Sequence, residues 1–151
     1  MADIVTKEKR SEMMAGIRSS DTHPELLIRK ALFRQGYRYR LHVKSLPGKP
    51  DLYFPKLNAV VLVNGCFWHG HPCHLFKLPS SREDFWREKI AKNRINDAKV
   101  LSRFSDLGVR TAVVWECAIK GKAKIPLEQI IIRLSEWLKG NSMQLEISSD
   151  K

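Results

Sequence analysis

Acidic residues are scarce in this chain. Its 151 residues include 16 Asp and Glu against 27 Lys and Arg, which gives a formal net charge of +11. A surplus of this size has to lie largely on the surface, where it attracts polyanions such as DNA, RNA or an anionic membrane. A well-solvated surface without a polyanionic partner is the simpler alternative.

Long apolar runs and a cysteine framework are also lacking. No apolar run approaches the roughly 18 residues that a membrane span needs, and the first ten residues are too polar for a signal peptide. We therefore expect a cytoplasmic protein with no membrane partner. Three cysteines, an odd number, argue against a disulfide framework. The length suits one domain with a single core.

The pattern of apolar residues predicts an α/β domain. Thr22 can cap a helix in which Glu25 completes a capping box, and this helix should end near Gly36. Alternating or continuous apolar runs predict strands over residues 37–43, 51–54, 59–63 and 109–115. Further helices are expected over residues 82–107 and 126–140. This order indicates a central mixed sheet with helices packed on it, in a domain over 21–140 between a mobile arm (1–20) and a loose tail (141–151).

Cysteine and histidine gather between residues 66 and 74. The candidate metal ligands are Cys66, His71, Cys73 and, after the last predicted strand, Cys117. Three thiolates and one imidazole are a set that tetrahedral Zn²⁺ accepts, and four protein ligands would make the metal structural. His69 and His74 are competing donors. Three independent buried thiols are the alternative, because free cysteine packs well as a small hydrophobe.

Asp51 is a candidate ligand for a hard cation. It opens a predicted strand after a turn, and a buried strand ends at Val63 soon afterwards. In one nuclease pattern an Asp at such a position is followed by an acid-x-Lys triplet on the next strand, and these groups bind a metal together with substrate phosphates. Val63-Asn64-Gly65 offers neither acid nor lysine, so Asp51 also fits an ordinary turn residue.

His69 could supply what the missing lysine would have done. Its imidazole titrates near neutrality and can take a proton from an attacking water. A zinc ligand or a surface histidine is the alternative.

Basic side chains crowd the loop and the long helix after the Cys/His region. They are Lys77, Arg82, Arg87, Lys89, Lys92, Arg94, Lys99 and Arg103. A stripe of this kind neutralises phosphates and releases counterions. Phe67 and Trp68 follow Cys66, and large aromatics on a stiffened loop can enter base steps and unstack them. The alternatives are packing around zinc for these two residues and a core position for Trp86.

Several segments together resemble a known family. They are SLPGKPD (45–51), NGCFWHGHPC (64–73), LFK (75–77), FWREKI (85–90), KN (92–93) and VWECA (114–118). Over Ala2 to about Gly140, the chain closely resembles the very short patch repair (Vsr) DNA mismatch endonucleases, and G-C-F-W-H-x-H-x-C is a highly specific motif. The resemblance implies a restriction-endonuclease-like α/β domain, in which helices flank a central mixed sheet beside a structural zinc site.

The resemblance also implies a reaction. It is Mg²⁺-dependent nicking of one strand 5′ of the thymine in a T:G mismatch, which arises when 5-methylcytosine deaminates. The implied substrate is mismatched double-stranded DNA, met in the bacterial cytoplasm at the nucleoid. Mismatch-repair proteins and a cognate cytosine-5 methyltransferase system are the candidate partners.

Site residues follow from the same resemblance. It implies Asp51 and the main-chain carbonyl of Val63 as magnesium ligands, His69 as general base and Glu25 as a supporting acid near the metal-bound water. The implied zinc ligands are Cys66, His71, Cys73 and Cys117. The implied DNA contacts are Met14, Phe67, Trp68, Trp86, Lys89 and Asn93.

The chain departs from the family pattern at one place. Family members can carry Thr-His where this chain has Val63-Asn64. Val63 can still act through its carbonyl, whereas Asn64 removes a histidine, which bears on the rate more than on the type of reaction. Asn64 keeps open a second class of function, a zinc-stabilised DNA-binding module that recognises a distorted duplex without cleaving it. An RNA-processing nuclease is a third hypothesis.

Overall fold

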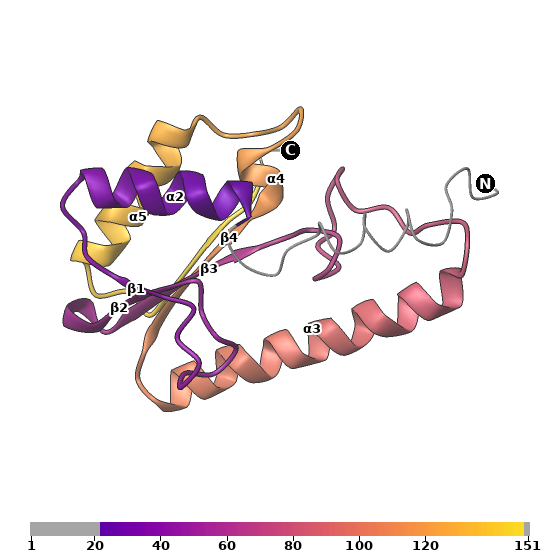
Figure 1. Ribbon diagram of the computed structural model, residues 1–151, viewed down its shortest axis with the longest axis horizontal. Coiled ribbons are helices and arrows are strands. Elements are labelled where there is room, and N and C mark those ends of the chain that lie inside the picture. Colours follow the sequence, from indigo (N-terminus) through magenta and orange to yellow (C-terminus); the bar gives the residue numbers. More distant parts are fainter. Residues whose placement is uncertain (1–21, 150–151) are drawn as a thin grey trace.

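The apolar run at residues 59–63 forms the centre of the sheet. In the computed structural model, which describes residues 22–149, the sheet has five strands in the order β1-β2-β3-β4-β5 (Figure 1). The strands are β1 (Arg40–Leu41), β2 (Leu52–Phe54), β3 (Ala59–Asn64), β4 (Arg110–Trp115) and β5 (Gln144–Ile147). The first three are antiparallel and the last three are parallel, which confirms the predicted mixed sheet.

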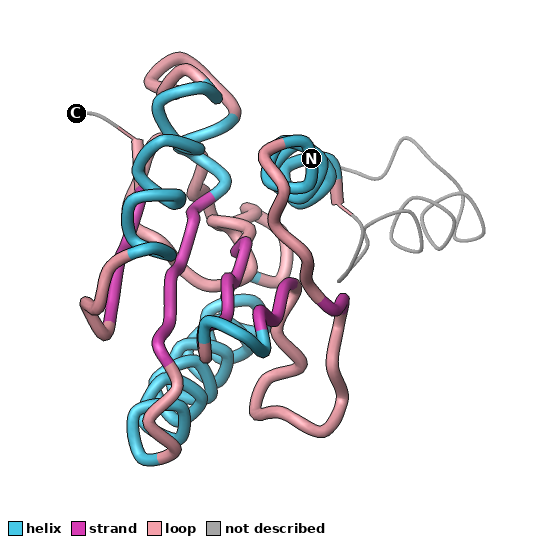
Figure 2. The backbone as a smooth tube through the Cα atoms, turned by 90° about the vertical axis from the view of Figure 1, so that its left-hand side faces the viewer, coloured by secondary structure: helices cyan, strands magenta, loops and turns pink. Residues whose placement is uncertain are grey.

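Helices cover both faces of this sheet (Figure 2). The helices α2 (His23–Arg34) and α5 (Leu127–Lys139) pack on one face, and α3 (Glu83–Asp106) lies on the other. Alternate side chains of β3 point to opposite faces of the sheet and pack against the helices on those faces. Val61 packs in the main core with Ile28 and Leu134, whereas Val60 contacts the smaller cluster around Phe104 of α3. Two short helices, η1 (Pro55–Leu57) and α4 (Glu116–Ile119), follow β2 and β4.

The N-terminal half of α3 extends beyond the sheet (Figure 1). It lies against the loop that leaves β3, and the close approach occurs at Gly70. This glycine has φ +62°, and a Cβ at this position would lie 2.7 Å from Cγ2 of the buried Ile90. Glycine is therefore required both for the backbone conformation and for the contact. The contact places the Cys/His and aromatic segment beside the basic helix.

Two expectations about the chain need correction. The strand expected over 37–43 is only Arg40–Leu41, and His42 adopts a left-handed conformation with φ 48°. The loose tail expected over 141–151 is wrong for Gln144–Ile147, because these residues pair with β4 and bury Ile147 completely. The domain thus continues beyond residue 140. The predicted arm over 1–20, including Met14, lies outside the described residues.

Among the helices of residues 22–149, none combines the length and the apolar character that a membrane span requires.

Candidate functional site

Two acids and a histidine from three segments meet at one end of α2. Thr22 caps this helix by accepting a hydrogen bond from the Glu25 N–H at 3.4 Å. The Glu25 carboxylate is only 1% exposed and contacts both Arg29 and His42. Glu25, His42 and Asp51 each bring a ligand atom within 4.8 Å of the other two, so this cluster could hold a metal ion. His42 was not predicted, because it lay inside an alternating pattern that indicated a strand.

The Asp51 carboxylate is held by a backbone amide near the carboxyl end of β3. Its Oδ2 accepts a hydrogen bond from the Val63 N–H at 2.7 Å. The N–H and C=O groups of one strand residue point to the same side, so the Val63 carbonyl faces the edge where Asp51 lies. Burial raises the pKa of Asp51 to about 7; the Val63 hydrogen bond opposes this shift, and the charge of Glu25 adds to it. A divalent cation would favour the ionised carboxylate.

His69 is paired with an acid that sequence reasoning missed. Its Nδ1 lies 2.5 Å from Oδ2 of Asp97 on α3. With the proton of a neutral imidazole on Nδ1, the opposite nitrogen, Nε2, can accept one. Asp97 is the only acid between Glu88 and Asp106 on a basic helix, and this isolation is the signal that could have singled it out.

His69 and Val63 belong to the same edge of the sheet. The His69 ring lies 6.1 Å from the ring of Trp115, which ends β4. Asn64, next to Val63, pairs with Trp115 in the parallel register of β3 and β4. The candidate base and the candidate cation site thus both lie at the carboxyl ends of these strands.

The predicted zinc ligands come together in a second cluster. Ligand atoms of Cys66, His71, Cys73 and Cys117 all lie within 4.8 Å of one another. Nδ1 of His71 is 3.6 Å from the sulfur atoms of both Cys66 and Cys117. Ideal zinc bond lengths and a tetrahedral angle give about 3.6 Å for such a nitrogen–sulfur separation. The donor set and the spacing therefore fit zinc.

Backbone amides surround the sulfur atoms of this cluster. The N–H groups of Cys117, Leu75 and Ser149 donate to the sulfurs of Cys66, Cys73 and Cys117 respectively, at 3.2–3.4 Å. Burial raises the pKa of the Cys66 thiol, so a bound cation would be needed to keep it ionised. The competing donors His69 and His74 lie outside the cluster, the former on Asp97 and the latter beside Gly121.

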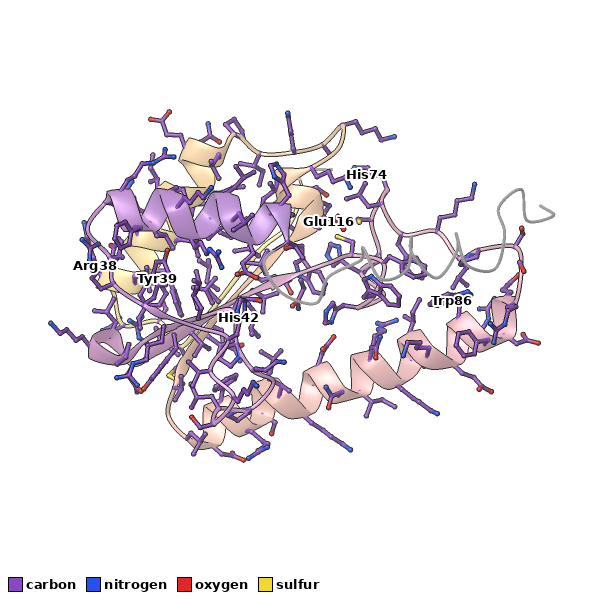
Figure 3. The ribbon with its side chains drawn as sticks, viewed as in Figure 1. Arg38, Tyr39, His42, His74, Trp86 and Glu116 are labelled. Atoms are coloured by element: carbon purple, nitrogen blue, oxygen red, sulfur yellow. The ribbon has the colours of Figure 1, made fainter. Side chains whose placement is uncertain are left out.

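The predicted DNA-contacting aromatics form a third group. Ring centroids of Phe67, Trp68 and Trp86 lie 5.2–5.6 Å apart, and all three side chains are half-buried. The side-chain amide of Asn93 donates to the Trp68 carbonyl at 2.8 Å. Figure 3 shows Trp86 on the part of α3 that extends away from the sheet, with His42 close to the strands. Lys89 is exposed on the same helix.

Comparisons with known proteins agree with one another. The family model for the DNA mismatch endonuclease Vsr matches residues 2–75. The chain is 41% identical over 149 residues to the DNA mismatch endonuclease Vsr of Escherichia coli (strain K12), which covers 99% of this chain and 96% of that protein. It is 48% identical over 123 residues to the type II nicking enzyme V.NmeAIP of Neisseria meningitidis, covering 82% and 88%. Over 119 residues it is 45% identical to the type II nicking enzyme V.XorIIP of Xanthomonas oryzae pv. oryzae, covering 79% and 88%.

The raised pKa of Asp51 predicts how the metal-free protein responds to pH. The folded carboxyl has a pKa of about 7, against 3.8 as its ordinary value. The unfolded chain therefore loses this proton first, and the stability contributed by this group falls as the pH rises from about 4 to 7. Asp51→Asn cannot ionise, so its stability relative to wild type should increase between pH 5 and pH 8.

Thermal melting in Mg²⁺-free buffer at the two pH values measures this difference. Asp106→Asn, which changes an exposed acid at the end of α3, is the control and should follow wild type. Parallel pH profiles for Asp51→Asn and wild type would contradict the prediction.

Proposed function

The chain belongs to the Vsr family of DNA mismatch endonucleases, so it is an endonuclease that acts on DNA, and we propose that it nicks one strand 5′ of the thymine in a T:G mismatch with Mg²⁺ as cofactor. The observation that supports this reaction is that the candidate cation ligands and the candidate base lie together at the carboxyl ends of β3 and β4. The oxygen ligands Asp51 and Val63 lie there with the His69–Asp97 pair. The restriction-endonuclease-like character of the fold is part of the same proposal.

The oxygen cluster suits a hard cation. Asp51 supplies a carboxylate oxygen, the Val63 carbonyl faces the same edge, and phosphate oxygens of the substrate would complete the shell. Bound there, Mg²⁺ would stabilise the charge that develops on the phosphate. Glu25, buried beside Asp51, would orient a water molecule next to the cation. The site would therefore bind the cation through one carboxylate ligand and one carbonyl, without an acid-x-Lys triplet.

His69 would act as the general base. Its Nε2 accepts a proton from the attacking water, while Asp97 holds the ring through Nδ1 and stabilises the imidazolium ion that forms. The water oxygen would bond to phosphorus as the bond from phosphorus to the leaving sugar oxygen breaks, and solvent would protonate that leaving oxygen. The proton taken by His69 would later pass to solvent. Asn64 follows the ligand Val63 on β3 and supplies no ionisable group.

Zinc would give the active-site loop its shape. Cys66, His71, Cys73 and Cys117 would bind one Zn²⁺, which would join the loop after β3 to the short helix α4. Phe67 and Trp68 lie directly beside the ligand Cys66, so the metal would stiffen the segment that enters the duplex. Trp86, Lys89 and Asn93 extend this surface along α3.

The remaining assignments rest on the family alone. Residues 1–20 would form a DNA-contacting arm that includes Met14. Mismatch-repair proteins and a cognate cytosine-5 methyltransferase system would be partners, at the bacterial nucleoid.

A nicking assay tests the reaction. Wild type should nick a labelled T:G duplex when Mg²⁺ is present and should not nick it when Mg²⁺ is omitted. Asp51→Ala should abolish nicking and leave binding to the duplex nearly intact, because it removes the carboxylate that holds the cation. His69→Ala should slow nicking by roughly 10²–10⁴-fold at unchanged zinc content. Activity of Asp51→Ala within a few-fold of wild type would place the cation elsewhere.

The same assay over all mismatches tests the substrate. Binding without any cleavage by wild type would favour the zinc-stabilised DNA-binding module, and equal cleavage of every mismatch would contradict T:G specificity.

The four ligands should hold zinc in the purified protein. Elemental analysis of untagged protein purified without chelator should find one Zn²⁺ per chain. Cys117→Ser should lose zinc and melt at a lower temperature, because binding of a structural metal contributes to folding free energy. His74→Ala, outside the cluster, is the matched control and should keep both. Wild-type protein without stoichiometric zinc would refute the assignment.

Mismatch selectivity should depend on Trp68. A mismatched step is already weakly stacked, so it costs less to open than a matched step. Trp68→Ala should weaken binding to mismatched duplex by about 1–3 kcal/mol, the range for base–aromatic stacking. Binding to matched duplex should change much less, because phosphate contacts dominate it.

Fluorescence anisotropy on both duplexes gives the two affinities, and thermal melting reports packing. Phe33→Ala removes an aromatic that is 52% exposed at the far end of α2, and it should change neither affinity. An equal loss on both duplexes, with a lower melting temperature, would show that Trp68 serves packing instead.

A further inference from the structure

His42 joins the two acids of the cation cluster through two different groups. Its imidazole Nε2 contacts the Glu25 carboxylate, and its backbone N–H donates to the Asp51 carbonyl at 3.3 Å. We propose that His42 is a positioning residue, which holds Glu25 of α2 beside the start of β2 so that Asp51 can bind a divalent cation with Glu25 next to it. This inference rests on the proposed function of the cluster.

The side-chain distances identify a hydrogen-bond donor. Nε2 lies 2.9 and 3.1 Å from the two oxygens of Glu25, but 3.9 Å from the nearer oxygen of Asp51. Carboxylate oxygens accept hydrogen bonds, so in this contact Nε2 is the donor. A protonated nitrogen cannot also bind a metal. Histidine ligands usually donate their other N–H to a protein group, and within residues 22–149 no hydrogen-bond partner of Nδ1 is seen.

The backbone of His42 supports the same conclusion. Its φ of 48° lies in the left-handed region, which residues other than glycine adopt less readily and which neighbouring contacts can stabilise. Here the stabilising contacts are the two bonds just described. In this conformation the His42 N–H donates to the Asp51 carbonyl, while the His42 ring contacts Glu25 in the first turn of α2.

Arg29 cannot replace this link. It also contacts Glu25, at 2.8 Å, but it lies one turn further along the same helix. Its ion pair orients the Glu25 side chain within α2. His42, in contrast, contacts both the Glu25 carboxylate and the backbone of Asp51.

Two variants of His42 separate hydrogen bonding from shape. His42→Gln keeps an N–H donor within reach of Glu25, whereas His42→Leu fills similar space without a donor. Mn²⁺ binding to the DNA-free, zinc-loaded protein, followed by electron paramagnetic resonance, should weaken about 10–100-fold in His42→Leu, the usual cost of losing such a supporting group. His42→Gln should recover most of this affinity. The Mg²⁺ concentration for half-maximal nicking should follow the same order.

Equal Mn²⁺ affinity in His42→Leu and wild type would overturn the proposal, as would a His42→Gln variant as weak as His42→Leu. A measurement on wild type covers the case in which His42→Leu does not fold. The Nε2–H resonance of His42 in nitrogen-15 NMR should persist when Mg²⁺ is added, and its loss would show direct coordination instead. Because Mn²⁺ binding and this resonance need no DNA, they remain informative if wild type fails to nick.

Discussion

The parallel pairing of β3 and β4 is the constraint on which the sites depend. Asn64 and Trp115 are register partners at the ends of these strands. Cys66 and Cys117 each follow their strand by two residues. The pairing therefore brings together two thiols that are 51 residues apart in sequence. The same strand end carries Val63, whose N–H fixes Asp51. One ladder of backbone hydrogen bonds thus sets both clusters.

Ligand chemistry keeps the two clusters apart. Carboxylate and carbonyl oxygens on α2, β2 and β3 suit hard cations, while thiolates and imidazole beyond the strand ends suit zinc. Segregation by donor type would allow two different metals to bind near the same strand ends without exchanging places. The aromatic group and the N-terminal half of α3 then extend from the Cys/His cluster, whereas the cluster of Glu25, His42 and Asp51 remains against the core.

Sequence reasoning succeeded where one strong local pattern decided the structure. The continuous apolar runs predicted β3 and β4, and Thr22 and Gly140 marked helix ends close to those observed. It failed at β5, because Leu145 and Ile147 are too few apolar residues to indicate a strand unless β4 offers an edge. Zinc-ligand candidates could be chosen by residue type. Asp97 and His42 could not, since their contacts with His69 and Glu25 join segments that are 28 and 17 residues apart in sequence.

The placement of β5 has a consequence for synthesis of the protein. Residues 144–149 leave the ribosome after every other strand, yet they cover the open edge of β4, and the Ser149 N–H donates to the sulfur of Cys117. A nascent chain that still lacks this segment has an incomplete sheet and a less shielded thiol. Translation order therefore delays completion of the fold until the basic, DNA-directed surface has already been made.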